Sequence, residues 1–75
     1  MTSDKLNTII NFCIENHAEL ILSVNNTIVF IDFNDDDRCI NTHTDEQYLY
    51  FWNYIFNHWN IIPIDSINTI QIQID

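Results

Sequence analysis

The segment ELILSVNNTIVFIDF, residues 19–33, predicts a β-hairpin. It consists of two runs rich in apolar and β-branched residues, separated by the two residues Asn25 and Asn26. Both central residues of a type I′ turn need a positive φ, and asparagine is the best residue for this after glycine, which the chain lacks. Alternate residues of both runs are therefore expected to line one face of a sheet.

A helix is predicted before this hairpin and a short strand after it. The helix covers Asp4 to about Asn16 and is expected to be capped by Ser3. Its apolar face follows the i, i+3, i+4, i+7 spacing and consists of Leu6, Ile9, Ile10, Cys13 and His17. The short strand is predicted over residues 38–42, with Ile40 pointing inward.

A second helix is predicted from Thr44 to about His58 or Trp59. Thr44 followed by Gln47 fits a capping box, with Asp45 and Glu46 in the first turn. The expected core stripe of this helix consists of Trp52, Ile55, Phe56 and Trp59. After Pro63, the residues Ile70, Ile72 and Ile74 alternate with polar ones and predict a terminal strand, expected beside the first strand.

The predicted element order is α-β-β-β-α-β. It indicates a two-layer α+β fold, in which two helices pack on one face of a small antiparallel or mixed sheet. The 75 residues are expected to form a single compact domain, residues 1–75. Below roughly 80 residues a core seldom supplies more than ~3–5 kcal/mol, so a deep substrate pocket is not expected.

The charge of the chain is strongly acidic, with Asp+Glu 11 against Lys+Arg 2 and a formal net charge of −9. Such a chain is repelled by nucleic acid and by anionic membranes, so neither is an expected partner. The expected partner is a basic protein surface. We also expect a soluble protein of the cytoplasm, in the host cell if the chain is phage-encoded, because no secretory segment or membrane-spanning run is seen.

No residue set predicts catalysis or a bound cofactor. Cys39 and His43 come nearest to a nucleophile and its base, but nothing nearby would lower the thiol pKa, and a chain without glycine has no phosphate-binding loop. Cys13 and Cys39 are predicted to be small buried residues. We therefore do not expect an enzyme.

One stretch of the sequence partly matches the ligand spacing of a calcium-binding loop, but the match is incomplete. Asp32, Asn34 and Asp36 occupy the first, third and fifth positions of a calcium loop, but Asp37 stands where glycine is required and His43 where a glutamate is required. A polar turn is the predicted structure, and no metal site is expected.

The most informative feature is a cluster of acidic residues. Six of the eleven carboxylates fall within fifteen residues: Asp32, Asp35, Asp36, Asp37, Asp45 and Glu46. They are expected to share one edge of the domain, where carboxylates on alternate residues, ~6.6–7 Å apart, would resemble a phosphate backbone. The alternative is that the charge only keeps an isoleucine- and tryptophan-rich domain soluble.

Two sets of apolar residues fall outside the expected core. Tyr50 and Tyr54 lie off the stripe of the second helix and are predicted to anchor a partner interface. Ile21, Ile28 and Phe30 fall on the outer face of the predicted sheet, where they would serve a homodimer or another partner.

The order of the predicted elements resembles the small phage-encoded anti-CRISPR inhibitors, especially a type II-A inhibitor of an RNA-guided nuclease. The likeness rests on Phe56-Asn57-His58-Trp59-Asn60 in the second helix and on Thr69-Ile70-Gln71-Ile72 near the end. The resemblance implies an acidic inhibitor that competes with nucleic acid on a host defence protein. Uracil-DNA glycosylase inhibitors and anti-restriction proteins share this use of charge.

The sequence thus predicts a non-enzymatic inhibitor that mimics DNA charge and occupies a basic nucleic-acid-binding surface. Its predicted contact residues are the six clustered acids with Tyr50 and Tyr54. One alternative is an immunity protein or antitoxin that neutralises a toxin nuclease. Another is a structural subunit that assembles through Ile21, Ile28 and Phe30, so that both a monomer and a homodimer stay open.

Overall fold

One helix and six strands form the protein in a computed structural model, which describes residues 1–34 and 37–74. The elements are α1 (Ser3–Glu15), β1 (Glu19–Val24), β2 (Thr27–Asp32), η1 (Asp37–Asn41), β3 (His43–Thr44), β4 (Tyr48–Asn53), β5 (His58–Pro63), η2 (Ile64–Ser66) and β6 (Ile67–Gln73). The strands form two antiparallel sheets in the orders β2-β1-β6 and β3-β4-β5. The predicted two-layer α+β fold, in which two helices pack on one face of a single sheet, is therefore wrong: the described residues form one α-helix and two three-stranded sheets.

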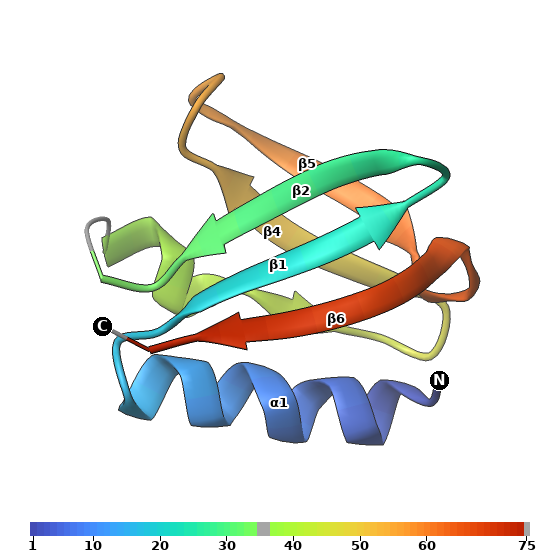
Figure 1. The fold of residues 1–75 in the computed structure, drawn as a ribbon, viewed down its shortest axis with the longest axis horizontal. Coiled ribbons are helices and arrows are strands. Elements are labelled where there is room, and N and C mark those ends of the chain that lie inside the picture. Colours follow the sequence, from blue (N-terminus) through green and yellow to red (C-terminus); the bar gives the residue numbers. More distant parts are fainter. Residues whose placement is uncertain (35–36, 75) are drawn as a thin grey trace.

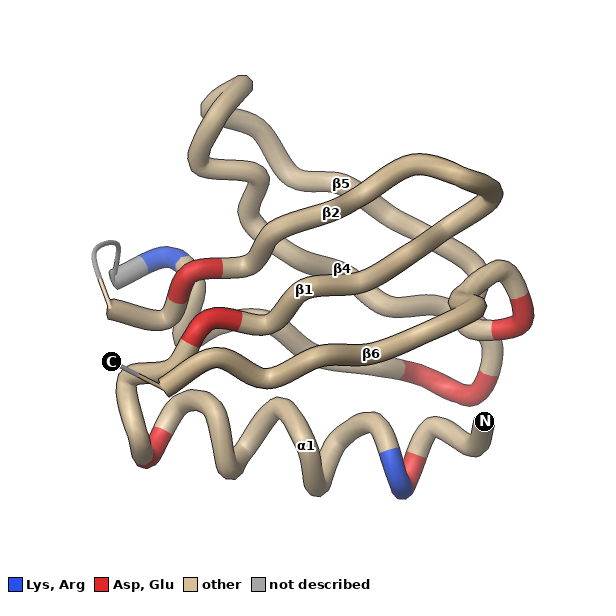
Figure 2. Tube along the Cα trace, viewed as in Figure 1, with Lys and Arg blue, Asp and Glu red and all other residues tan. Residues whose placement is uncertain are grey.

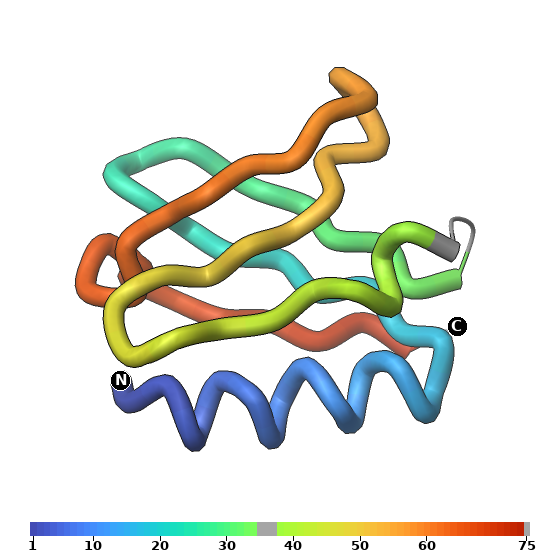
Figure 3. The backbone as a smooth tube through the Cα atoms, turned by 180° about the vertical axis from the view of Figure 1, so that it is seen from behind, coloured from blue at the N-terminus to red at the C-terminus, as the bar shows by residue number. Residues whose placement is uncertain are grey.

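The two sheets lie one in front of the other, and α1 runs along one side of them (Figure 1). The helix lies beside β6 of one sheet and β3 of the other, as the view from behind also shows (Figure 3). It contacts β3 and β1. The main cover of the β2-β1-β6 sheet is therefore the second sheet, instead of the predicted pair of helices.

Buried side chains from both sheets and the helix form one core. Its fully buried members include Leu20, Leu22 and Ile31 from the first sheet, Leu49 and Phe51 from the second, and Leu6, Ile10 and Cys13 from α1. Each such aliphatic or aromatic side chain contributes about 1.5–3 kcal/mol when it is removed from water. The core thus joins all three layers.

The predicted hairpin is confirmed. Leu22 pairs with Val29 in the β1–β2 ladder, and the turn residues Asn25 and Asn26 have φ values of 49° and 66°. The last strand lies beside β1, as predicted, with Leu22 opposite Ile70, but the sheet is antiparallel throughout.

The predicted first helix, α1, is also confirmed, but its N-terminal capping residue differs from the predicted one. Thr2, one residue earlier than predicted, accepts a hydrogen bond from the backbone N–H of Lys5 at 3.2 Å. Leu6, Ile10 and Cys13 of the predicted stripe are buried. His17 follows the helix with a φ of 50°, so it belongs to the turn into β1.

The predicted strand over residues 38–42 is wrong. This segment forms the 3₁₀ turn η1, in which Ile40 is exposed. Thr42 closes the turn, because its backbone N–H and its hydroxyl both donate to the carbonyl oxygen of Cys39, at 3.1 and 2.6 Å. The fully buried Cys39 side chain anchors the turn in the core.

The second predicted helix is replaced by the hairpin β4–β5. The segment is rich in tyrosine, phenylalanine, tryptophan and isoleucine, which fit a pleated sheet better than a helix. Asn57 supplies the positive φ, 55°, that the β4–β5 turn needs. Asn53 holds the same turn, since its Oδ1 accepts from the backbone N–H groups of Ile55 and Phe56 at 3.1 and 3.2 Å.

Candidate partner-binding face

The outer face of the β3-β4-β5 sheet carries a row of aromatic side chains. Along β4, Leu49 and Phe51 point into the core, so that Tyr48, Tyr50 and Trp52 point outward. The ladder pairs His43 and Ile61 with Tyr50, and Trp59 with Trp52. We call this set the aromatic face; it consists of His43, Tyr48, Tyr50, Trp52, Trp59 and Ile61.

Tyr50 is the fixed centre of the aromatic face. Its hydroxyl donates a hydrogen bond to Oδ2 of Asp45 at 2.7 Å. The ring of His43 stacks on it, with centroids 4.8 Å apart and an interplanar angle of 9°. Tyr48 approaches edge-on at 6.5 Å. Contacts on several sides thus hold the Tyr50 ring in one orientation.

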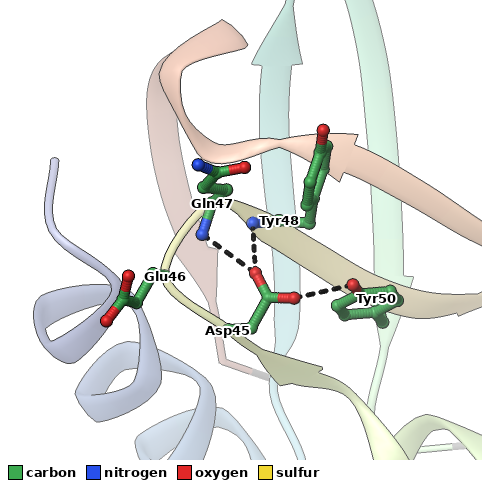
Figure 4. A pocket seen from close by; sticks show the side chains of 5 residues that line it. All are labelled: Asp45, Glu46, Gln47, Tyr48 and Tyr50. Atoms are coloured by element: carbon green, nitrogen blue, oxygen red, sulfur yellow. Dashed lines mark hydrogen bonds between the residues drawn. The ribbon is translucent and has the colours of Figure 1, made fainter.

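Asp45 organises the turn between β3 and β4. Its Oδ1 accepts from the backbone N–H groups of Gln47 at 2.9 Å and Tyr48 at 2.8 Å (Figure 4). The backbone N–H of Asp45 in turn donates to the carbonyl of Tyr48 at 3.0 Å. A carboxylate that accepts from N–H groups two and three residues ahead is also the signature of a helix cap. The predicted capping box of Thr44 and Gln47 is not formed: Asp45 makes these hydrogen bonds in the β3–β4 turn, and the buried Thr44 hydroxyl has no partner among the described residues.

The hydrogen bond between Asp45 and Tyr50 shifts the pKa of both groups. The Tyr50 hydroxyl, followed by the two backbone N–H groups, lowers the pKa of Asp45 below its ordinary value, because all three bonds favour the carboxylate. The same bond raises the pKa of Tyr50 above its ordinary value, because the phenolate would lose it. The turn therefore keeps a negative charge beside a neutral tyrosine.

A hollow of about 390 Å³ lies at this turn. It is lined by Asp45, Glu46, Gln47, Tyr48 and Tyr50 (Figure 4). The Glu46 carboxylate points away from that of Asp45, toward α1. Carboxylates and the faces of aromatic rings both attract cations, so the hollow has the chemistry to receive a lysine or arginine side chain.

A second hollow of about 500 Å³ lies on the other side of Tyr50. Its lining combines strand and turn residues: Asn41, His43, Tyr50, Trp59 and Ile61. Beyond it, Trp52 is only 7% exposed although it belongs to the outward row. The guanidinium of Arg38 covers its ring at 4.0 Å, and Trp59 meets it edge-on at 5.8 Å.

The predicted acidic residues do not share one edge. Asp32 ends β2, where its Oδ1 accepts from the backbone N–H of Asn34 at 2.9 Å, and Asp45 and Glu46 form the β3–β4 turn. The end of β2 and the β3–β4 turn lie at opposite ends of the molecule (Figures 1 and 2). Acidic residues therefore occur at both ends.

The other predicted contact residues either lie outside the described residues or lie away from Asp45. Asp35 and Asp36 lie outside the described residues, and only the backbone of Asp37, in η1, is described. Tyr54 is exposed in the β4–β5 turn, at the end of β4 away from Asp45. Of the predicted set, the structure thus brings together Asp45, Glu46 and Tyr50.

The sequence-based prediction did not assign His43, Trp59 and Ile61 to a partner-binding face. The signal that could have found them is the period of two in Tyr48, Tyr50 and Trp52, which predicts one face of a strand. It was obscured because the intervening residues, Leu49 and Phe51, are apolar as well.

The side chains of both cysteines, Cys13 and Cys39, are buried, as predicted. Burial raises the pKa of Cys13. In residues 1–34 and 37–74, no three side chains of His, Cys, Asp or Glu are grouped so that they could hold a metal ion.

Comparison with known proteins returns no match among protein families, curated proteins or solved structures. Within the described part of the chain, α1 is too short and too polar to span a bilayer, and no other helix is long enough.

Proposed function

We propose that this protein is a non-enzymatic acidic inhibitor that binds a basic, nucleic-acid-binding surface of a host protein through its aromatic face. The hollow at the β3–β4 turn carries the proposal, because it places the carboxylate of Asp45 beside the ring of Tyr50, with Glu46 also in its lining. This chemistry suits an arginine or lysine of a partner. The net charge of −9 suits the same partner at long range.

The proposal differs from simple mimicry of a phosphate row. Because the described acids lie at both ends of the fold, they are expected to steer a basic partner toward the protein, while the aromatic face supplies the desolvated contact. The proposed setting, a phage inhibitor of a host defence nuclease, comes from the sequence resemblance alone. Residues 56–60, on which part of that resemblance rests, lie in the β4–β5 turn and in β5 instead of in a helix.

Competition with DNA tests this function. The protein is immobilised, exposed to a lysate of its host, and washed at increasing salt; an excess of duplex DNA is then added. We expect retained proteins to bind nucleic acid, to be released by the DNA, and to be lost as salt rises from about 50 to 200 mM. Retention that resists both DNA and salt would contradict the proposal.

A pair of charge-matched variants locates the contact. Asp45→Asn with Glu46→Gln and Asp4→Asn with Glu15→Gln each remove two negative charges at exposed positions. Only the first pair lies beside the aromatic face. We expect both to slow association with the retained protein, and the first also to speed dissociation, because rim charges act on the association rate and direct contacts on the dissociation rate. Equal dissociation rates would place the contact elsewhere.

A second candidate function is assembly with copies of itself. Of the three residues predicted on the outer face of the β2-β1-β6 sheet, Ile28 and Phe30 are exposed and Ile21 is half-buried. Light scattering at high concentration tests this. A dimer that Ile28→Lys dissociates would support assembly through this face, and a monomer would contradict it.

A further inference from the structure

The two hollows on the aromatic face adjoin each other, because Tyr50 lines both. The hollow at the β3–β4 turn has carboxylates, whereas the second hollow is lined by neutral or aromatic groups and by Ile61. Ile61 is 59% exposed, so a large apolar surface remains in contact with water. A ligand that covers both hollows therefore needs a cation at one position and an apolar group at the next.

The apolar hollow is preformed. The Nδ1 atom of His43 lies 2.8 Å from the carbonyl oxygen of Asn41, and the ring of His43 stacks on Tyr50. Tyr50 is held in turn by Asp45 at 2.7 Å. A partner residue that enters the hollow thus orders no further side chain among these three, which lowers the entropic cost of binding.

The spacing of the face matches an extended peptide. The hollow at the β3–β4 turn is lined by Tyr48 and Tyr50. The second hollow is lined by Tyr50 and by Trp59, which pairs with Trp52, so it lies one two-residue step further along β4. Side chains on one side of an extended chain repeat every ~6.6–7 Å. A segment that runs along β4 would therefore place residues two positions apart on the two sides of Tyr50.

The charge of the protein selects among possible occupants. Aromatic rings also stack on nucleobases, but a chain with a net charge of −9 repels a polyanion. A basic peptide segment is attracted instead. Charge and hollow chemistry thus favour the same occupant.

We infer that the aromatic face binds an extended segment of the partner in which an arginine or lysine and a large apolar residue stand two positions apart. The cation enters the hollow of Asp45 and Glu46, and the apolar side chain packs between Trp59 and Ile61. This inference rests on the proposed function, since it specifies the ligand of the same face.

Selection from a library of random linear peptides tests the inference. The whole protein is the bait, and the best enriched peptide is then synthesised as the probe. We expect enrichment of arginine or lysine with leucine, isoleucine, phenylalanine or tryptophan two positions away.

Two matched variants then test the hollow itself. Ile61→Ser and Ile28→Ser remove the same side chain from the outer faces of different sheets, where the isoleucines are 59% and 54% exposed. We expect Ile61→Ser to weaken binding of the probe by about tenfold, from the apolar area that it no longer buries. Ile28→Ser is expected to leave the affinity unchanged.

The outcomes separate this inference from the proposed function. Enrichment of cations without an apolar neighbour, or equal effects of the two serine variants, would overturn the inference and leave a basic partner in place. Selection of peptides without cations would overturn the proposed function, and the inference with it.

Discussion

The guanidinium carbon of Arg38 lies 4.0 Å from the ring centroid of Trp52, so that η1 reaches over one end of the aromatic face. A cation over an indole ring contributes about 0.5–2 kcal/mol, depending on how far it is desolvated. The contact explains why Trp52 is nearly buried although its strand neighbours on the same face are not. It also joins one of the two basic residues of the chain to the proposed binding surface.

Removal of this cover should expose the indole. In a Trp59→Phe background, which leaves Trp52 as the sole tryptophan, Arg38→Ala is expected to shift the fluorescence emission to longer wavelength and to increase quenching by acrylamide. Arg38→Lys keeps a cation but loses the planar stack, so an intermediate effect is expected. Unchanged emission in Arg38→Ala would show that the guanidinium does not shield the ring.

The parts of the fold that the sequence predicted are those encoded by neighbouring residues. The hairpin around Asn25 and Asn26 needs only two alternating runs and two residues that accept positive φ. The helix α1 needs only its cap and its apolar stripe. The last strand was predicted from its alternating isoleucines, and β1 is its neighbour as expected. The predicted half-buried row is only partly formed, because Ile70 packs against the core whereas Ile72 and Ile74 are exposed.

The prediction of a second helix was wrong because the same segment contains apolar residues at both helical and strand spacing. The residues Trp52, Ile55, Phe56 and Trp59 have helical spacing, while nearly every residue from Tyr48 to Trp52 is apolar and so fits a strand as well. The Thr44–Gln47 motif did not decide between them, because Asp45, and not the predicted cap Thr44, accepts hydrogen bonds from the backbone N–H groups in the β3–β4 turn. Tertiary packing of Leu49 and Phe51 decides it.

Two phenylalanines distinguish the strand from the predicted helix. Phe51 is 2% exposed and Phe56 is 70% exposed, although the helical stripe would bury Phe56. Phe51→Ala is expected to lower the free energy of unfolding by about 3–5 kcal/mol. Phe56→Ala should change it by no more than about 0.5 kcal/mol. Urea denaturation measures both, and a large loss for Phe56→Ala would contradict the β4–β5 hairpin.

The candidate site was only partly predictable, since it depends on how the chain returns on itself. Asp32 and Asp45 are thirteen positions apart, and the sequence gives no sign that η1 and β3 carry the chain from one end of the molecule to the other. Tyr50 was identified because it lay off the expected stripe. Trp59 and Ile61 join it only through the β4–β5 register, which no local pattern specifies.

The turn between β1 and β2 offers a stability test that involves no side-chain packing. Asn26 has a φ of 66°. This backbone conformation costs a residue with a Cβ about 1–2 kcal/mol, whereas glycine adopts it without steric cost. Asn26→Gly is therefore expected to raise the thermal midpoint, and Asn26→Ala to lower it. Equal midpoints for the two variants would contradict a type I′ turn.

The hydrogen bond between Asp45 and Tyr50 makes the stability of the fold depend on pH, and the pKa shifts give the direction of this dependence. Because its folded pKa is lowered, Asp45 contributes stability fully above its unfolded pKa, and this contribution is lost as the pH falls through the folded pKa. Asp45→Asn should therefore be less stable than the parent protein at neutral pH, with a difference that shrinks in acid. Glu46→Gln, which removes a charge from the same turn, should leave a smaller difference at every pH, as urea denaturation would measure.

Tyr50 reports the same bond from the alkaline side. The pKa of Tyr50 is higher in the folded protein than in the unfolded chain. Its contribution to stability is therefore full below the pKa of the unfolded chain and is lost as the pH rises through the pKa of the folded protein. In a titration followed by phenolate absorbance, Asp45→Asn should lower the midpoint of Tyr50, because the neighbouring charge that opposes ionisation is gone. If the midpoint stays in place in Asp45→Asn, Asp45 does not hold Tyr50 in solution, and the fixed centre of the aromatic face is lost with it.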